Sequence, residues 1–278
     1  YVQAEAQGQG SLRFTLNGHG ARVQVGAELN HGVAGAVLEV DRAAFWSPQA
    51  PNLYELQVEL LQGHKVVDSY NLPVGIRTIS VQGDQLLLNG QPIVLKGFGR
   101  HEDFPINGRG LNPAVIIKDY ELMRWVGANS FRTTHYPYSD EMMDMADRLG
   151  FLVIDETPAV GLFFAEAGLE KRFALNQRML DEMIARDKNH PSVIMWSLAN
   201  EPHSHGPRPK DYLRRLYDNA KALDDSRPVT LVSHMGLFEA AFEFVDVVCL
   251  NRYYGWYTES GQLDEGLKML QAEIEAIY

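Results

Sequence analysis

The chain has 278 residues, of which 45% are hydrophobic and 22% charged, and its formal net charge is −11. This is the composition of an ordinary globular protein with room for one large domain, or for a large and a small one. The acidic balance without a basic cluster disfavours nucleic acid as a partner, and no stretch reaches the roughly 18 apolar residues of a membrane span.

Residues 1–78 show the pattern of short β-strands separated by Gly, Asn and Pro. Leu56, Val58 and Leu60 alternate with polar residues, which predicts a strand with one buried face. The predicted strands, in chain order, are 12–16, 21–25, 36–40, 53–61 and 66–72. Strands at this spacing without a helical segment predict a small immunoglobulin-like β-sandwich that carries no catalytic groups.

From residue 79 to residue 278 the pattern is of alternating strands and helices. A hairpin is predicted over 79–94 with its turn at Asn89-Gly90, and further strands are predicted at 93–98, 130–134, 152–155, 193–198, 229–232 and 247–250. Helix starts are predicted at Asn112-Pro113 and Ser139-Asp140, and helix ends at Gly127 and Gly150. Two helical faces are apolar, one formed by Leu213, Leu216, Ala220 and Leu223 and one by Leu263, Leu267, Leu270 and Ile274.

Repeated βα units predict a parallel sheet, either open or closed into a barrel. No glycine-rich phosphate loop follows a predicted strand, which weakens a nucleotide-binding open sheet. The segments that follow the strands are polar or aromatic: 99–103, 132–136, 155–156, 200–201 and 251–254. A (β/α)8 TIM barrel collects such groups in one mouth. Six units are present rather than eight, so we expect a barrel truncated after the sixth βα unit.

A pocket of carboxylates, amides and aromatic rings suits a sugar, and glycoside hydrolysis needs a carboxylic acid beside the anomeric centre. Glu201 follows a buried strand and is our candidate for the acid, with Asn200 placed to bind the sugar 2-hydroxyl. The pair Asp155-Glu156 is interpreted equally well as part of the site or as a polar strand terminus. The close pair His203 and His205 lacks a third ligand, so we predict no metal site and no cofactor.

Residues 186–193 and the heptapeptide WSLANEP at 196–202 closely resemble the acid/base strand of glycoside hydrolase family 2. Three further segments, 97–103, 129–138 and 251–257, resemble the β-glucuronidases of that family. The resemblance implies a retaining exo-glycosidase that removes terminal β-D-glucuronic acid from small-molecule or oligosaccharide glucuronides. It assigns the following roles: acid/base, Glu201; 2-hydroxyl partner, Asn200; substrate contacts, His101, His135, Tyr253, Trp256 and Tyr257; orientation of the nucleophile, Arg132.

The chain departs from this family in the second half of the barrel. It has neither the nucleophile motif of the seventh strand nor the Asn-x-Lys motif near the last strand, and Glu102 and Glu156 do not fit the nucleophile pattern. We therefore expect the 278-residue chain alone to be inactive, and to be poorly soluble or associated. Two alternatives stay open, a β-galactosidase-type enzyme of the same family and a non-catalytic sugar-binding or structural fragment.

The N-terminus shows neither a signal peptide nor an initiator Met. We expect a bacterial, cytoplasmic protein without membrane contact, which forms a homo-oligomer at full length.

Overall fold

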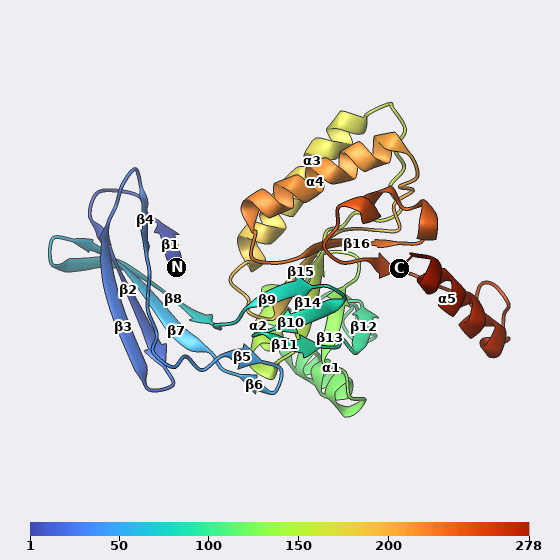
Figure 1. Ribbon diagram of the computed structural model, residues 1–278. Coiled ribbons are helices and arrows are strands. Elements are labelled where there is room, and N and C mark those ends of the chain that lie inside the picture. Colours follow the sequence, from blue (N-terminus) through green and yellow to red (C-terminus); the bar gives the residue numbers. More distant parts are fainter. Residues whose placement is uncertain (278) are drawn as a thin grey trace. The chain divides into compact units, whose positions relative to one another are not determined.

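The computed structural model describes residues 1–277, which divide into two compact units (Figure 1). The first unit contains residues 1–77 together with 144–150 and 189–191. The second contains residues 78–143, 151–188 and the chain from 192 onward. Within the described residues, no helix has the length and apolar character needed to cross a membrane.

Residues 1–77 form antiparallel sheets. The largest sheet has the strand order β3 (Ala21–Glu28), β2 (Ser11–Gly18), β7 (Tyr54–Gln62) and β8 (Lys65–Val74). A second sheet pairs β1 (Val2–Glu5) with β4 (Val33–Ala36), and a third pairs β5 (Trp46–Ser47) with β6 (Ala50–Pro51). Residues of β1 and β4 pack against the buried residues of β2 and β7, so these sheets enclose a common core.

The core of this unit follows from the two-residue period of its strands. Phe14 is fully buried on β2, and Leu56 on the neighbouring β7 is 6% exposed. Val58 and Leu60 continue the same face of β7 and pack against the same core. Glu59, on the opposite face, instead accepts a 2.7 Å hydrogen bond from an arginine on β2. The predicted alternation in β7 is therefore confirmed.

One strand prediction in this unit is wrong. The strand expected at 36–40 is β4, which ends at Ala36, and residues 37–40 have no regular secondary structure. Leu38 and Val40 nevertheless pack against the core. Their alternating hydrophobicity reflects a loop that covers the sheet rather than a paired strand.

The second unit begins with a three-stranded antiparallel sheet rather than the single hairpin predicted. Its strands are β9 (Ile79–Gln82), β10 (Gln85–Leu88) and β11 (Gln91–Ile93), with β10 in the centre. The predicted turn has positive φ at both Asn89 (52°) and Gly90 (74°), as a type I′ turn requires. A second turn passes through Gly83, whose φ is 60°.

A six-stranded parallel sheet follows and carries the predicted site. Its order is β12 (Gly97–Arg100), β13 (Ser130–Thr133), β14 (Leu152–Glu156), β15 (Val193–Asn200), β16 (Val229–Ser233) and β17 (Cys249–Leu250). Each strand pairs with its successor in the chain, as in a barrel, whereas the order reverses in a doubly wound sheet. The strand predicted at 93–98 is displaced to 97–100, because residues 94–96 form a connection without strand structure. The strand predicted at 247–250 is shortened to 249–250.

An α-helix follows each of these strands in the chain except β16 (Figure 1). The helices are α1 (Pro113–Trp125), α2 (Asp140–Leu149), α3 (Leu169–Asp187), α4 (Pro207–Leu223) and α5 (Leu263–Ile277). Two short 3₁₀ helices, η1 (Gly236–Phe238) and η2 (Ala240–Glu243), occupy the connection from β16 to β17.

The predicted helix ends are confirmed. Asn112 caps α1 by accepting a hydrogen bond from the Val115 amide at 3.3 Å. Gly127 and Gly150 follow α1 and α2 with φ of 82° and 75°, the left-handed conformation in which glycine commonly ends a helix.

The two predicted apolar helix faces have different outcomes. On α4, Leu213 and Leu216 are buried, but Leu223 is 46% exposed because it is the last residue of the helix. On α5, Leu263 is 74% exposed and Leu267 is 56% exposed. Glu273 of α5 accepts a 2.6 Å hydrogen bond from Arg252, and this contact connects the helix to the segment that follows β17. The apolar face of α5 thus stays open to solvent in the described structure.

Two carboxylates are buried together in this unit, Asp155 on β14 and Asp187 at the end of α3. Asp155 and Asp187 are both 0% exposed. Burial and the adjacent Asp187 carboxylate raise the pKa of Asp155 well above its usual value, although Thr133 donates a 2.9 Å hydrogen bond to Asp155. The folded protein therefore retains a proton on this pair that the unfolded chain releases near pH 4.

We expect the stabilising effect of this proton to be complete below about pH 4 and to be lost as the pH rises through the raised folded-state pKa. Each unit of pKa difference is equivalent to about 1.4 kcal/mol. In urea unfolding of the wild type, the midpoint urea concentration should decrease as the pH is raised from about 4, the pKa of an unfolded Asp, and Asp155→Asn should flatten that dependence. Asp225→Asn, at an exposed loop position, is the matched control. An unchanged slope in Asp155→Asn would contradict the assignment.

Candidate active site

The residues with the chemistry of the site lie at the carboxyl ends of the parallel strands. All eight residues of β15 are buried, which explains its apolar sequence. Asn200 is the last residue of the strand, and Glu201 follows with its amide donating to the Val232 carbonyl of β16 at 2.7 Å. Glu201 has a left-handed backbone, with φ of 48°, which few non-glycine residues adopt.

The Glu201 carboxylate is held by two groups from the segment that follows β17. Its Oε1 accepts a 2.7 Å hydrogen bond from Asn251 Nδ2 and another from the Tyr253 hydroxyl. Burial raises the pKa of Glu201, but these hydrogen bonds and the nearby imidazoles of His234 and His135 outweigh it, so the net pKa lies below its ordinary value. Burial and the Glu201 carboxylate raise the pKa of Tyr253 to about 12. The proton therefore stays on the tyrosine, and Glu201 is anionic at neutral pH.

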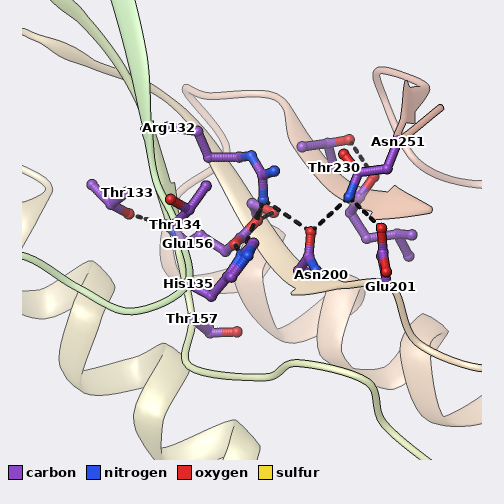
Figure 2. Close-up of polar contacts among 12 residues, drawn as sticks. Arg132, Thr133, Thr134, His135, Glu156, Thr157, Asn200, Glu201, Thr230 and Asn251 are labelled. Carbon is purple, nitrogen blue, oxygen red and sulfur yellow. Dashed lines mark hydrogen bonds and ion pairs between the residues drawn. The ribbon is translucent and has the colours of Figure 1, made fainter. Parts of the chain in front are cut away.

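Asn200 connects the two sides of the site, and Figure 2 shows it between Arg132 and Asn251. Its Oδ1 accepts from Arg132 Nη1 at 3.2 Å and from Asn251 Nδ2 at 3.0 Å. Two donors on one atom identify that atom as the oxygen, so the other end of the amide is the NH₂ group. Among residues 1–277 no hydrogen bond is made by Asn200 Nδ2, which leaves this donor for a ligand hydroxyl.

Arg132 and His135 are both anchored by Glu156, the last residue of β14. Glu156 is 0% exposed and accepts from Arg132 Nη1 at 2.6 Å and from Ser197 Oγ at 2.8 Å. Its other oxygen lies 2.7 Å from His135 Nδ1, so Nδ1 carries the imidazole proton and Nε2 is left for a ligand. Glu156 has no exposed surface, and both of its oxygens are hydrogen-bonded within the site. Glu156 is thus a support for the cation and the imidazole.

The aromatic residues predicted as substrate contacts form a continuous group after β17. Tyr253 packs against Tyr257 with ring centroids 4.7 Å apart, and Tyr257 packs against Trp256 at 4.4 Å. Trp256 is 65% exposed and Tyr257 is 67% exposed. The hydroxyl of Tyr253 donates to Glu201, so this group continues from the Glu201 carboxylate to a solvent-exposed ring surface.

His101, after β12, completes the set. Its ring lies edge-on to the ring of His135, with centroids 5.7 Å apart, and its Nδ1 is 3.4 Å from the Tyr136 hydroxyl. All eight residues singled out from the sequence therefore belong to one connected set of contacts.

Sequence reasoning missed the parts played by Glu156 and Asn251. The sequence does not decide whether Glu156 is a site residue or a polar strand terminus, and it predicts no role for Asn251, although this residue lies in a segment that resembles the family. A fully buried carboxylate at a strand end needs a partner, and Arg132, two strand positions away in the neighbouring β13, was the available cation. That pairing was the usable signal.

One group of residues outside this site has the spacing of metal ligands. Among the described residues, Asp144, Asp147 and His190 offer ligand atoms that all lie within 4.8 Å of one another. His190 Nδ1 is already 2.6 Å from Asp147 Oδ2, so these two side chains satisfy each other as a hydrogen-bonded pair. His203, one of the close His pair in the sequence, stacks on Phe163 with ring centroids 4.0 Å apart.

Comparison with known protein families gives two matches that together span almost the whole chain. The model described as "Glycosyl hydrolases family 2" matches residues 3–77, and the model described as "Glycosyl hydrolases family 2, TIM barrel domain" matches residues 79–277. A β-glucuronidase of Paenibacillus borealis is 45% identical over 238 residues, and one of Homo sapiens is 42% identical over 254 residues. These alignments cover 82% and 87% of this chain but only 40% and 38% of the relatives.

Solved structures show the same relationship. The β-D-glucuronidase of Dictyoglomus thermophilum superposes with a TM-score of 0.90 at 40% identity, covering 97% of this chain and 48% of that one. The β-glucuronidase of Bifidobacterium dentium, solved with coumarin-3-O-glucuronide, superposes with a TM-score of 0.88 at 40% identity. It covers 96% of this chain and 45% of that one. The present chain therefore spans less than half of the proteins that it matches.

Proposed function

This chain belongs to glycosyl hydrolase family 2, and on that basis we propose that it supplies the acid/base side of the active site of a β-glucuronidase. The complete protein would release terminal β-D-glucuronic acid from small-molecule or oligosaccharide glucuronides with retention of configuration. The observation that carries the proposal is the hydrogen-bonded chain from Arg132 to Asn200 and, through Asn251, to Glu201 at the carboxyl ends of one parallel sheet. The high identity to β-glucuronidases supports the choice of sugar.

In this proposal Glu201 donates a proton to the glycosidic oxygen in the first step and activates water as a base in the second. Asn200 offers its Nδ2 to the sugar 2-hydroxyl, because its Oδ1 is already occupied by Arg132 and Asn251. The proposed substrate contacts are His101, His135, Tyr253, Trp256 and Tyr257.

Retention also requires a nucleophilic carboxylate at about 5 to 5.5 Å from the acid. Neither strand-end candidate fits this role. Glu156 is enclosed by three donors, and Glu102, which is 9% exposed, accepts hydrogen bonds from the Ser139 amide at 3.1 and 3.2 Å. We therefore propose that the nucleophile lies on a strand outside residues 1–278, and that β12–β17 are the first six strands of the barrel. Arg132 would orient it, since Nη2 and Nε of Arg132 make no hydrogen bond within residues 1–277.

A second carboxylate would also change the acidity of Glu201. A negative charge within about 6 Å disfavours ionisation of a neighbouring carboxyl group. It would oppose the hydrogen bonds from Tyr253 and Asn251, which lower the pKa of Glu201 in the present structure. The acid would then hold its proton in the free enzyme and lose it once the nucleophile is glycosylated and neutral.

Three further parts of the proposal rest on the sequence. They are a boundary near residue 78 between the immunoglobulin-like domain and the barrel domain, a homo-oligomeric complete protein, and a cytoplasmic location. Each remains a prediction.

The proposed function is tested on the complete protein with two substrates that share one leaving group, p-nitrophenyl β-D-glucuronide and p-nitrophenyl β-D-galactoside. We expect turnover of the glucuronide and little turnover of the galactoside, with β-glucuronic acid as the first product seen by NMR. Preference for the galactoside would favour the related β-galactosidase function. Binding of glucuronate without turnover would favour a non-catalytic sugar-binding protein.

A further inference from the structure

Glu239 is a buried carboxylate that the proposed mechanism does not use. It lies between η1 and η2 in the connection from β16 to β17 and is 5% exposed. Among the described residues it forms no ion pair with a lysine, arginine or histidine. Burying a carboxylate without a cation is costly unless several donors satisfy it. Its donors therefore indicate what the residue holds in place.

Three donors from three places in the chain converge on Glu239. Oε1 accepts from the Ala241 amide at 2.9 Å, which caps η2. Oε2 accepts from Ser233 Oγ at 2.6 Å and from Ser204 Oγ. Both serines are 0% exposed. Because a carboxylate can only accept, it directs both hydroxyl protons toward itself and ties the two serines together.

Each of these serines leads directly to Glu201. Ser204 lies three residues after Glu201 in the loop that leaves β15, and its carbonyl also accepts from the Ala240 amide at 3.3 Å. Ser233 is the last residue of β16, and its carbonyl accepts from the Asn251 amide at 2.8 Å. The side chain of Asn251 in turn holds the Glu201 carboxylate. Glu239 thus links the backbone segment of Glu201, through Ser204, to Asn251, through Ser233.

The backbone of Glu201 gives an independent reason for such a tie. Its φ of 48° is in the left-handed region, and a non-glycine residue stays there only where the surroundings over-determine it. The Glu201 amide is restrained on one side by Val232, the residue before Ser233. The link from Ser204 to Glu239 restrains the segment on the other side.

We propose that Glu239 is a positioning residue for Glu201, which holds Ser204 and Ser233 together and so places the acid/base carboxylate against the glycosidic oxygen. The kinetic effect expected from this proposal rests on the proposed function. The hydrogen bonds from Ser204 and Ser233 to Glu239 do not depend on it. A displaced general acid impairs substrates in proportion to their need for protonation. A loss of folded protein, by contrast, lowers turnover of every substrate by the same factor.

The test compares Glu239→Ala, Glu239→Gln and Ser204→Ala in the complete protein. Glu243→Gln is the matched control, because this residue is 68% exposed on η2 and pairs with Lys210 at the surface. Two aryl glucuronides are used, one with a poor leaving group and one with an activated leaving group. For Glu239→Ala we expect kcat/KM to fall about 100-fold with the first substrate and less than about 3-fold with the second. Glu239→Gln should recover part of the loss, and the control should match wild type.

An equal loss with both substrates, or no loss, would overturn the proposal. Amide hydrogen exchange of the segment 201–206 provides a second readout that needs no turnover. It should accelerate in Glu239→Ala and Ser204→Ala but not in Glu243→Gln, and unchanged exchange there would also overturn it. A wild-type protein that does not hydrolyse glucuronides would refute the proposed function, while the exchange result would still decide the role of Glu239.

Discussion

Replacement of Glu201 with glutamine in the complete protein is expected to lower kcat/KM for a glucuronide with a poor leaving group by about 10² to 10⁴-fold. Glutamine has the shape of glutamate and can still accept hydrogen bonds from Asn251 and Tyr253, so folding should be preserved. The glutamine side chain has no acidic proton to transfer to the glycosidic oxygen. Steady-state kinetics with a series of aryl glucuronides provides the measurement.

Two features of the result identify an acid rather than a binding residue. The loss should shrink as the phenol of the leaving group becomes more acidic, because such leaving groups depart with little protonation. The alkaline limb of the pH profile of kcat/KM should also disappear, because that limb reports ionisation of the acid in the free enzyme. An equal loss across the series would show that Glu201 acts mainly in binding.

The second large effect is expected at Glu156. Glu156→Gln leaves Arg132 and His135 beside a neutral amide in a buried site, where Arg132 is 15% exposed and Glu156 is 0% exposed. Breaking a buried ion pair by removing one partner typically costs 3–5 kcal/mol, and we expect a loss of about 3 kcal/mol in the stability of the barrel unit. Urea unfolding measures this loss. Turnover should fall as well, since Arg132 would no longer be held for the nucleophile.

A double-mutant cycle separates the pair from its neighbours. Arg132→Ala alone should reduce kcat much more than it changes KM, because its proposed role is to hold the nucleophile rather than the sugar. The double variant should cost clearly less than the sum of the two single variants, since either change already breaks the pair. Additive losses would mean that Glu156 and Arg132 act independently. A change of KM alone in Arg132→Ala would contradict its orienting role.

Local features of the chain were predictable because their causes lie within a few residues. The Asn112 side chain reaches the Val115 amide in the same turn. Gly150 ends α2 because left-handed φ is accessible to glycine whatever packs around it. The apolar run of β15 similarly identified a buried strand, and the polar residues after it identified the edge that carries the site.

The errors fall where a distant part of the chain makes the decision. Residues 37–40 alternate like a strand but find no paired partner, and they cover the core as a loop. Leu223 shares a helical face with buried residues and is exposed only because α4 ends there. The turn at Gly83 divides what reads in sequence as one strand of a hairpin.

The sequence itself singled out Glu201, Asn200 and the aromatic group as candidates, through segments that resemble a known family and stand at predicted strand ends. Only the tertiary structure decided what restrains them. Glu156 reaches Arg132 across 24 residues, Asn251 reaches Glu201 across 50, and Glu239 reaches Ser204 across 35. The sequence pattern marks which residues end a strand. The partners of a buried carboxylate depend on which strand ends adjoin, and that is set by the pairing of the sheet.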